Sequence, residues 1–120
     1  MVNTNCLTYE KCAQLLQTGR AKIDGCRAKK LENNTYLYHD GEAFHVRVHQ
    51  TDVVSILPEN TWVLRTGGWY TKLTSERINT YAPVQIWKHR GDWFYTIGGT
   101  TFEFKNGVRI SKEDIVEELI

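Results

Sequence analysis

Residues 43–49 read Ala-Phe-His-Val-Arg-Val-His, an uninterrupted alternation of apolar and polar side chains. In an extended strand, successive side chains point to opposite faces of the sheet. The pattern therefore predicts a half-buried strand in an antiparallel sheet, with one face on the core and the other toward solvent. The two faces are Phe44, Val46 and Val48 on the apolar side, and His45, Arg47 and His49 on the polar side.

The same period of two continues on both sides of this stretch. Turn-forming pairs separate the extended segments, and Asp40-Gly41 and Asn106-Gly107 are strong signals for tight hairpins. The pattern predicts two antiparallel meanders, separated by a short helix. It predicts about eight short strands, at residues 35–39, 43–49, 52–57, 61–65, 84–89, 93–97, 100–104 and 108–110.

Three other segments carry helical signals. Thr8 is a suitable N-cap for an N-terminal helix, and the Thr74-Ser75 pair offers caps for a short middle helix over residues 75–81. Ser111, with Asp114 three residues later, predicts a C-terminal helix. The expected fold class is therefore α+β, because the regular helix–strand alternation of a parallel nucleotide-binding sheet is missing.

The length predicts a single domain over residues 1–120. Within it we expect a helical, basic part at 1–32, an antiparallel sheet with its middle helix at 33–110, and an acidic helix at 111–120. Residues 20–30 carry five basic residues around a central glycine, which predicts a weak second helix or an irregular connector.

The many aromatic residues predict a contact surface, whereas the net charge by itself does not predict a highly charged partner. Four Trp, six Tyr and four Phe are many for 120 residues, so we expect one or two exposed rings at a contact surface. The net charge of +1 does not by itself indicate non-specific binding to nucleic acid. Residues 1–34, however, carry six Lys or Arg against three acids. That basic end fits a phosphate-bearing ligand or an ordinary solvated face.

The three cysteines, Cys6, Cys12 and Cys26, are an odd number without a CxxC pair. Together with the lack of a signal peptide or a transmembrane run, they predict a reducing cytoplasm and no membrane partner. No standard spacing of metal ligands is present. We therefore expect neither a metal nor another cofactor.

The polar face of the first strand is one candidate binding site. Arg47 supplies a planar fork suited to phosphate or carboxylate, and His45 and His49 add donors near neutral pH. The alternative is an open sheet face on which these side chains simply meet water.

Residues 65–71 read Arg-Thr-Gly-Gly-Trp-Tyr-Thr and form a second candidate region. They lack the spacing of phosphate loops and dinucleotide-binding loops. We interpret the glycine pair as a bend that buries Trp69. The start of the following helix nevertheless favours an anion, because its first N–H groups are free. The candidate ligand residues here are Arg65, Tyr70, Thr71, Thr74 and Arg77, with Tyr70 expected to stack on a base.

Four motifs in order carry a family resemblance: NNTYL (33–37), VRVHQTDVV (46–54), LRTGGWYT (64–71) and SERINTY (75–81). Over roughly residues 30–95 the chain resembles a widespread group of small phage- and prophage-encoded proteins with the motifs NTxL, RLHxTDVV, LxSGGWxT and RIN. It departs from them at Thr66, where Ser is usual, and at Lys72-Leu73, inside a lead usually rich in Thr. The resemblance implies a phage context and no particular activity.

The leading hypothesis is a non-enzymatic phage accessory protein that binds a phosphate-bearing ligand, either a nucleotide signal or nucleic acid, in the host cytoplasm to counter a host defence. An alternative is a protein–protein inhibitor of a host effector, such as a nuclease or a CRISPR complex. A third is a small hydrolase built on His49 and Asp52, for which no accompanying nucleophile motif is present. A symmetric homo-oligomer is compatible with the first hypothesis.

Overall fold

The computed structural model describes residues 6–114, which adopt the predicted α+β fold with antiparallel sheets. Two helices are α1 (Tyr9–Leu16) and α2 (Lys72–Tyr81). The larger sheet contains β1 (Ala21–Ile23), β2 (Cys26–Glu32), β3 (Thr35–His39), β4 (Phe44–Val48), β5 (Thr51–Leu57), β6 (Thr61–Leu64) and β10 (Val108–Ile110), in that order. The smaller sheet contains β7 (Gln85–His89), β8 (Asp92–Ile97) and β9 (Thr100–Glu103).

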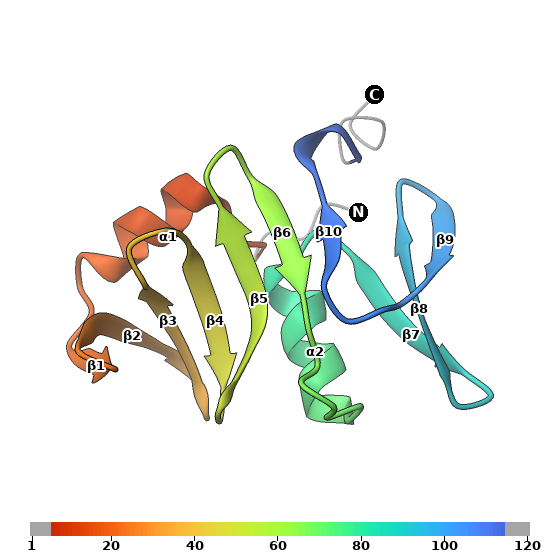
Figure 1. Cartoon of the computed structure of the whole chain (residues 1–120), viewed down its shortest axis with the longest axis horizontal. Coiled ribbons are helices and arrows are strands. Elements are labelled where there is room, and N and C mark those ends of the chain that lie inside the picture. The colour runs from red at the N-terminus through yellow and green to blue at the C-terminus, as the bar shows by residue number, and fades with distance from the viewer. Residues whose placement is uncertain (1–5, 115–120) are drawn as a thin grey trace.

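Both helices pack on one face of the seven-stranded sheet, and the smaller sheet lies beside β10 (Figure 1). The core lies between the sheet and the helices, because the apolar sides of the alternating strands all point that way. Its most deeply buried members are Cys12, Leu37, Val46, Val54, Ile56, Leu64, Ile78 and Ile110.

The alternating stretch at 43–49 forms β4, as predicted. Its apolar residues, Phe44, Val46 and Val48, are buried, and its polar residues, His45 and Arg47, are partly exposed. The strands from β3 to β6 form one antiparallel meander, as predicted from the period of two.

The basic segment at 20–30 is a β-hairpin, so the prediction of a helix or an irregular connector there is wrong. β1 pairs with β2, with Ala21 opposite Ala28. Asp24 and Gly25 make the turn with positive φ angles of 49° and 82°. An Asp-Gly pair is a strong hairpin signal, but basic residues on both faces of the flanking strands hide the alternation. The described chain consequently has ten strands rather than eight.

The last strand belongs to the larger sheet and not to the second meander, so the predicted hairpin at Asn106-Gly107 is also wrong. β10 pairs with β6, with Val108 opposite Leu64, and the Gly107 N–H donates to the carbonyl of Leu64 at 2.8 Å. The chain therefore crosses back from the smaller sheet to the edge of the larger one.

The middle helix and the C-terminal helical segment differ in how far they agree with their predicted bounds. The middle helix begins at Lys72, three residues earlier than predicted, because Thr71 is the N-cap and its side chain accepts a bond from the Thr74 N–H. At the C-terminal end, residues 112–114 are helical, and the Ser111 N–H and hydroxyl both donate to the Asp114 carboxylate. The rest of the predicted helix over 111–120 lies outside the described residues.

Candidate functional site

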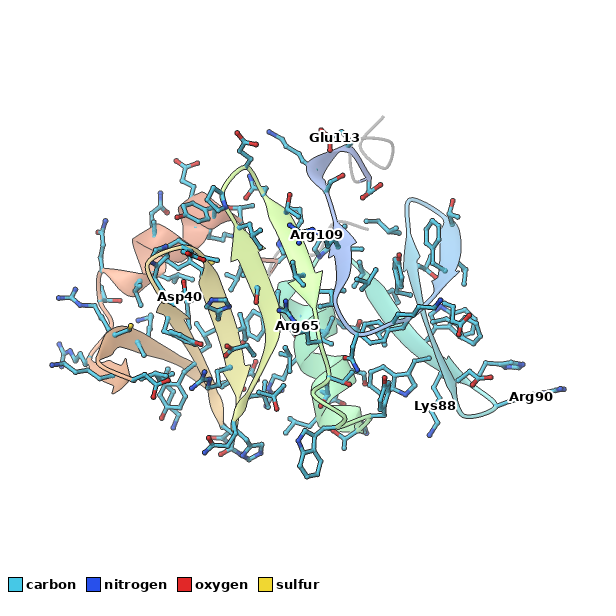
Figure 2. The ribbon with its side chains drawn as sticks, in the orientation of Figure 1. Asp40, Arg65, Lys88, Arg90, Arg109 and Glu113 are labelled. Carbon is cyan, nitrogen blue, oxygen red and sulfur yellow. The ribbon has the colours of Figure 1, made fainter. Side chains whose placement is uncertain are left out.

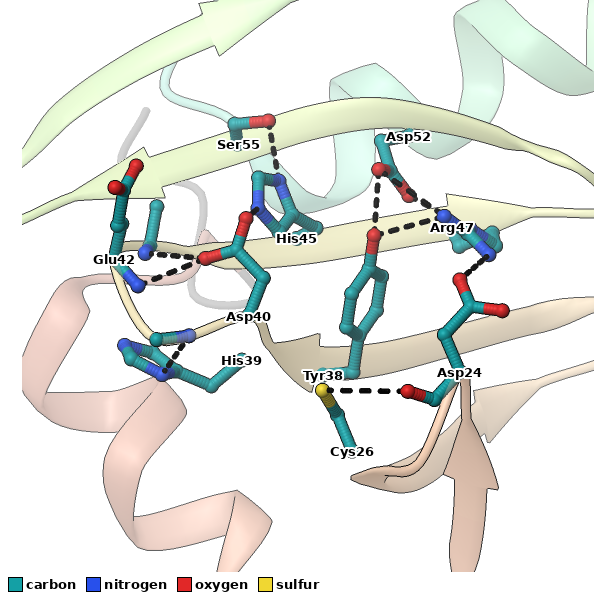
Figure 3. Close-up of polar contacts among 12 residues, drawn as sticks. Asp24, Cys26, Tyr38, His39, Asp40, Glu42, His45, Arg47, Asp52 and Ser55 are labelled. Atoms are coloured by element: carbon teal, nitrogen blue, oxygen red, sulfur yellow. Dashed lines mark hydrogen bonds and ion pairs between the residues drawn. The ribbon is translucent and has the colours of Figure 1, made fainter.

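The polar side chains of β4 and β5 form hydrogen-bonded chains rather than an open row (Figure 3). His45 Nε2 lies 2.8 Å from Asp40 Oδ2, and His45 Nδ1 lies 2.7 Å from Ser55 Oγ. Arg65 Nη1 donates to the same Ser55 oxygen at 3.3 Å. The side chains of His45 and Arg65, two predicted ligand residues, thus both form hydrogen bonds to Ser55 Oγ.

The Asp40, His45 and Ser55 chain has the residue types of a nucleophilic triad, but its geometry favours a structural role. Ser55 is only 2% exposed, so a substrate has little access to its oxygen. The Asp40 carboxylate accepts two backbone N–H bonds, from Ala43 and Glu42, as well as its bond to His45. These bonds lower the pKa of Asp40 well below its usual range.

Arg47 is held by partners from three other segments. Its Nε lies 2.9 Å from Asp52 Oδ1, its Nη2 donates to the Tyr38 hydroxyl at 2.9 Å, and its Nη1 lies 3.6 Å from Asp24 Oδ2. The guanidinium also lies over the Tyr38 ring. An arginine whose donors are already used on carboxylates has few left for a phosphate.

His49 does not share the face of His45 and Arg47. It lies after the end of β4, in a turn with a φ of 55°, and its backbone N–H donates to the Asn34 carbonyl at 2.9 Å. The Asp52 carboxylate is bonded to Arg47 and Tyr38. The prediction that the two histidines and Arg47 form one row on a strand is therefore wrong.

Arg77 also has a protein partner. Its Nη1 lies 3.1 Å from Glu32 Oε1, and its Nε donates to the Thr35 hydroxyl at 2.9 Å. The Tyr81 hydroxyl donates to the other oxygen of the same Glu32 carboxylate. Arg77 thus joins α2 to β2 and β3, rather than pointing to the start of its own helix.

The remaining predicted residues lie near the first turn of α2. The Thr71 hydroxyl caps the helix and lies 3.1 Å from the Thr74 hydroxyl. Thr74 is only 4% exposed, so its side chain serves this local contact. Thr71 and Tyr70 are exposed. Among the predicted residues, only these two face a recess at this end of the helix.

The glycine bend leaves its tryptophan in solvent, so the prediction that Trp69 is buried is wrong. Trp69 is 65% exposed, while Thr66 before the bend is fully buried. The bend holds together through polar contacts: the Trp69 N–H donates to the Thr66 carbonyl, and the Gly68 N–H donates to the Thr66 hydroxyl. Because these bonds satisfy the backbone, the ring is not needed as an anchor.

A cleft of about 250 Å³ lies between the start of α2 and the edge strand β7. We call it the aromatic cleft. Tyr70 packs edge-to-face on Trp93, with 5.0 Å between the ring centroids, and Trp87 stacks on Phe94 at 4.9 Å. Its lining residues are Tyr70, Thr71, Lys72, Ser75, Ile86, Trp87, Lys88 and Trp93.

The aromatic cleft combines exposed rings with positive charge. Tyr70 is 50% exposed and Trp87 38% exposed, although aromatic rings of this size are usually buried. Lys72 and Lys88 stand on its two sides, from α2 and β7. Lys88 and the neighbouring Arg90 project from the β7–β8 hairpin, away from the larger sheet (Figure 2). The cleft therefore places partly exposed rings next to two cations, of which Lys72 also lies 3.8 Å from Glu76 Oε1. Rings beside cations suit a ligand that carries both a base and an anionic group.

One part of this cleft has a recognisable sequence pattern, but the sequence does not show which segments come together to form the cleft. The run from Trp87 to Arg90 alternates rings and basic residues, a pattern typical of stacking combined with phosphate contact. Its proximity to Tyr70 could not be predicted, because the contact joins a loop to a strand in the other sheet.

The described part of the chain, residues 6–114, holds no cluster of three His, Cys, Asp or Glu side chains that could bind a metal ion. The three cysteines are free thiols, and burial raises the pKa of Cys6 to about 11 and that of Cys12 to about 12. No helix within the described range is long and apolar enough to cross a membrane.

The fold and the cleft define a small α+β protein of antiparallel sheets with an aromatic, lysine-flanked recess. The chain belongs to the family described as Kyanoviridae Gp96 protein, whose model matches residues 17–111. This match confirms the predicted phage context. No curated protein and no solved structure matches the chain.

Proposed function

We propose that this phage protein acts by binding, and that its ligand carries both an aromatic base and a phosphate, as a nucleotide or a nucleic-acid strand does. The observation that supports this proposal is the aromatic cleft, in which the partly exposed rings of Tyr70 and Trp87 lie between Lys72 and Lys88. A base stacks on such rings whatever its identity, and a lysine attracts the phosphate attached to it.

The cleft is small, so it would hold at most one base and its phosphate. Its volume of about 250 Å³ is somewhat below the range of drug-sized pockets. The hydroxyls of Thr71 and Ser75 lie at the same end as Lys72, at the first turn of α2, where the helix dipole also favours an anion. We propose that binding of such a ligand serves to counter a host defence.

The exposed rings also suit a second candidate, an inhibitor of a host protein. Trp69 at 65% exposure and Phe102 at 44% exposure lie outside the lining of the aromatic cleft. Exposed aromatic residues are enriched in protein–protein interfaces. Binding of a host effector that depends on Trp69 and not on Lys88 would favour this second function.

Tryptophan fluorescence tests the nucleotide proposal directly, because Trp87 and Trp93 both line the cleft. The protein is titrated with nucleoside mono-, di- and cyclic phosphates and with short single-stranded oligonucleotides. We expect saturable quenching by at least one of them. The Lys88→Gln variant should weaken that binding about five- to thirtyfold, since a charge-assisted contact is worth roughly 1–2 kcal/mol.

Arg109→Gln provides the matched control. Arg109 is an exposed basic residue on β10, on a different part of the surface from Lys88 (Figure 2). This variant should bind with the affinity of the unmodified protein. The proposal is wrong if no member of the panel quenches the fluorescence, or if Lys88→Gln and Arg109→Gln weaken binding equally.

A further inference from the structure

A second and larger recess, which we call the basic groove, lies where the chain leaves α1 and enters the β1–β2 hairpin. Its volume is about 930 Å³. Among residues 6–114, four cationic side chains line it and no carboxylate does. The charged residues and the one ring in its lining are Arg20, Arg27, Lys29, Lys30 and Tyr36.

The nearest acidic residues along the chain are already paired elsewhere. Asp24, in the β1–β2 turn, lies 3.6 Å from Arg47 Nη1, and Glu32, at the end of β2, lies 3.1 Å from Arg77 Nη1. These carboxylates therefore neutralise arginines outside the groove rather than the cations that line it. A recess with four cations and no acid in its lining attracts a polyanion.

Two of the four cations are held in place. Arg27 Nη1 donates to the Gln17 carbonyl at 3.3 Å, and Lys29 Nζ donates to the Thr18 hydroxyl at 2.7 Å. These bonds connect the strand to the end of α1 and reduce the motion of both side chains. Within residues 6–114, Arg20 and Lys30 are exposed and enter no ion pair. Their ammonium and guanidinium groups can contact a ligand without losing a protein partner.

We propose that the basic groove binds the sugar-phosphate backbone of a single nucleic-acid strand. Lys29 and Lys30 point to opposite faces of β2, so the four cations of the groove are spread around this edge of the sheet. Spread charges match the successive phosphates of a strand better than they match one small anion. The half-buried ring of Tyr36 lines the same recess and offers a face to an unpaired base, which a duplex would not present. This inference rests on the proposed function and deepens it, since it selects a strand over a free nucleotide.

The groove and the aromatic cleft are separate sites. β1 and β2 lie at one end of the larger sheet, and β7 lies beyond its other end (Figure 1). A mononucleotide would occupy the aromatic cleft alone, whereas a strand can also use the groove. The salt dependence of strand binding distinguishes binding in the cleft alone from binding that also uses the groove. The slope of log affinity against log salt is proportional to the number of phosphates that the protein neutralises.

The test is fluorescence anisotropy with a labelled twenty-nucleotide single-stranded oligonucleotide and with its duplex, over a series of salt concentrations. Four phosphate contacts predict a slope of log affinity against log salt of about −3 from this groove. The double variant Arg20→Gln, Lys30→Gln should reduce the magnitude of the slope by about 1.4 and bind more weakly at low salt. The duplex should bind more weakly than the single strand.

Lys22→Gln is the control, because Lys22 is an exposed lysine of β1 that does not line the groove. It should change the slope by less than half as much as the double variant. An unchanged melting temperature would show that the double variant is folded, as expected for two exposed side chains.

The outcomes separate the two proposals. If strand binding responds to Lys88→Gln but its salt slope is the same in the double variant, the groove inference is wrong and the proposed function stands. Duplex binding as tight as single-strand binding also overturns the inference. If neither nucleotides nor oligonucleotides bind, both proposals are wrong.

Discussion

Asn106 and Thr66, forty residues apart in the chain, are joined by two hydrogen bonds to one oxygen. The Thr66 N–H donates to Asn106 Oδ1 at 2.6 Å, and the Thr66 hydroxyl donates to it at 3.0 Å. The amide nitrogen of Asn106 donates in turn to the Tyr70 hydroxyl at 3.1 Å. One side chain thus holds both ends of the glycine bend and sets the position of Tyr70 in the aromatic cleft.

Replacing Asn106 with alanine should therefore destabilise the bend. Thr66 is fully buried, and an unsatisfied buried N–H or hydroxyl costs roughly 1–3 kcal/mol. We expect Asn106→Ala to lower the free energy of unfolding in urea by about 2 kcal/mol. The exposed neighbour Lys105 is the control, and Lys105→Ala should change that free energy by less than about 0.5 kcal/mol. Equal effects of the two variants would contradict this role of Asn106.

Arg77 should prove to be a structural residue. Its side chain is 14% exposed and pairs with Glu32, which also accepts from Tyr81. Arg77→Ala removes the pair and leaves the Glu32 carboxylate without its cation, which predicts a loss of about 2 kcal/mol in unfolding free energy. Arg109→Ala, at an exposed position, should cost much less. Urea unfolding of both variants checks this, and an Arg77→Ala protein as stable as the parent would restore Arg77 as a ligand candidate.

The contrast between β4 and the β1–β2 hairpin shows which part of the fold the sequence reveals. β4 has apolar residues on one face only, so the alternation of apolar and polar residues identifies the strand from the sequence. β2 carries Arg27, Lys29 and Lys30 on both faces, so it has no such period. The pairing of β10 with β6 was not predictable either, because it depends on contacts between residues 44 to 48 positions apart.

The sequence identifies residues of a type that can bind an anion, but it does not show which of them already have a partner within the protein. A guanidinium fork fits a phosphate and a carboxylate equally well. Sequence alone therefore could not show that Arg47 and Arg77 face Asp52 and Glu32. Tyr70 and Thr71 are exposed beside the start of α2, and their role as ligand residues stays a prediction.

The hydrogen bonds of Asp40 predict a specific loss of stability in acid. N–H bonds from Ala43 and Glu42, and the contact with His45, hold the pKa of this carboxyl below that of the unfolded chain. A lowered pKa in the folded state stabilises the protein above the unfolded pKa of about 4, and this contribution is lost as the pH falls below that value. Asp40→Asn should therefore show a smaller loss of stability between pH 5 and pH 2.

The measurement is the urea midpoint across that pH range. Glu42→Gln is the control, because it removes one negative charge from an exposed residue two positions after Asp40. Glu42→Gln should follow the parent protein as the pH falls. If the difference between Asp40→Asn and the parent is the same at pH 5 and at pH 2.5, the lowered pKa of Asp40 does not contribute to stability.

The two glycines of the bend should differ in their tolerance of a methyl group. Both have positive φ angles, 61° for Gly67 and 90° for Gly68, so alanine at either position is strained by roughly 1–2 kcal/mol. A Cβ on Gly67 would also lie 2.7 Å from Thr51 Cγ2, whereas one on Gly68 would have no atom within 4 Å. Gly67→Ala should therefore cost about 1–3 kcal/mol more than Gly68→Ala, because of overpacking.

A second substitution separates the steric cost from the backbone cost. Thr51→Ser removes the Cγ2 methyl that a Cβ on Gly67 would meet. In a double-mutant cycle, Thr51→Ser should recover part of the stability lost in Gly67→Ala and none of that lost in Gly68→Ala. Additive effects at both glycines would mean that backbone conformation alone requires Gly67. Recovery at Gly67 would instead show that the Cγ2 methyl of Thr51 leaves no room for a Cβ on Gly67.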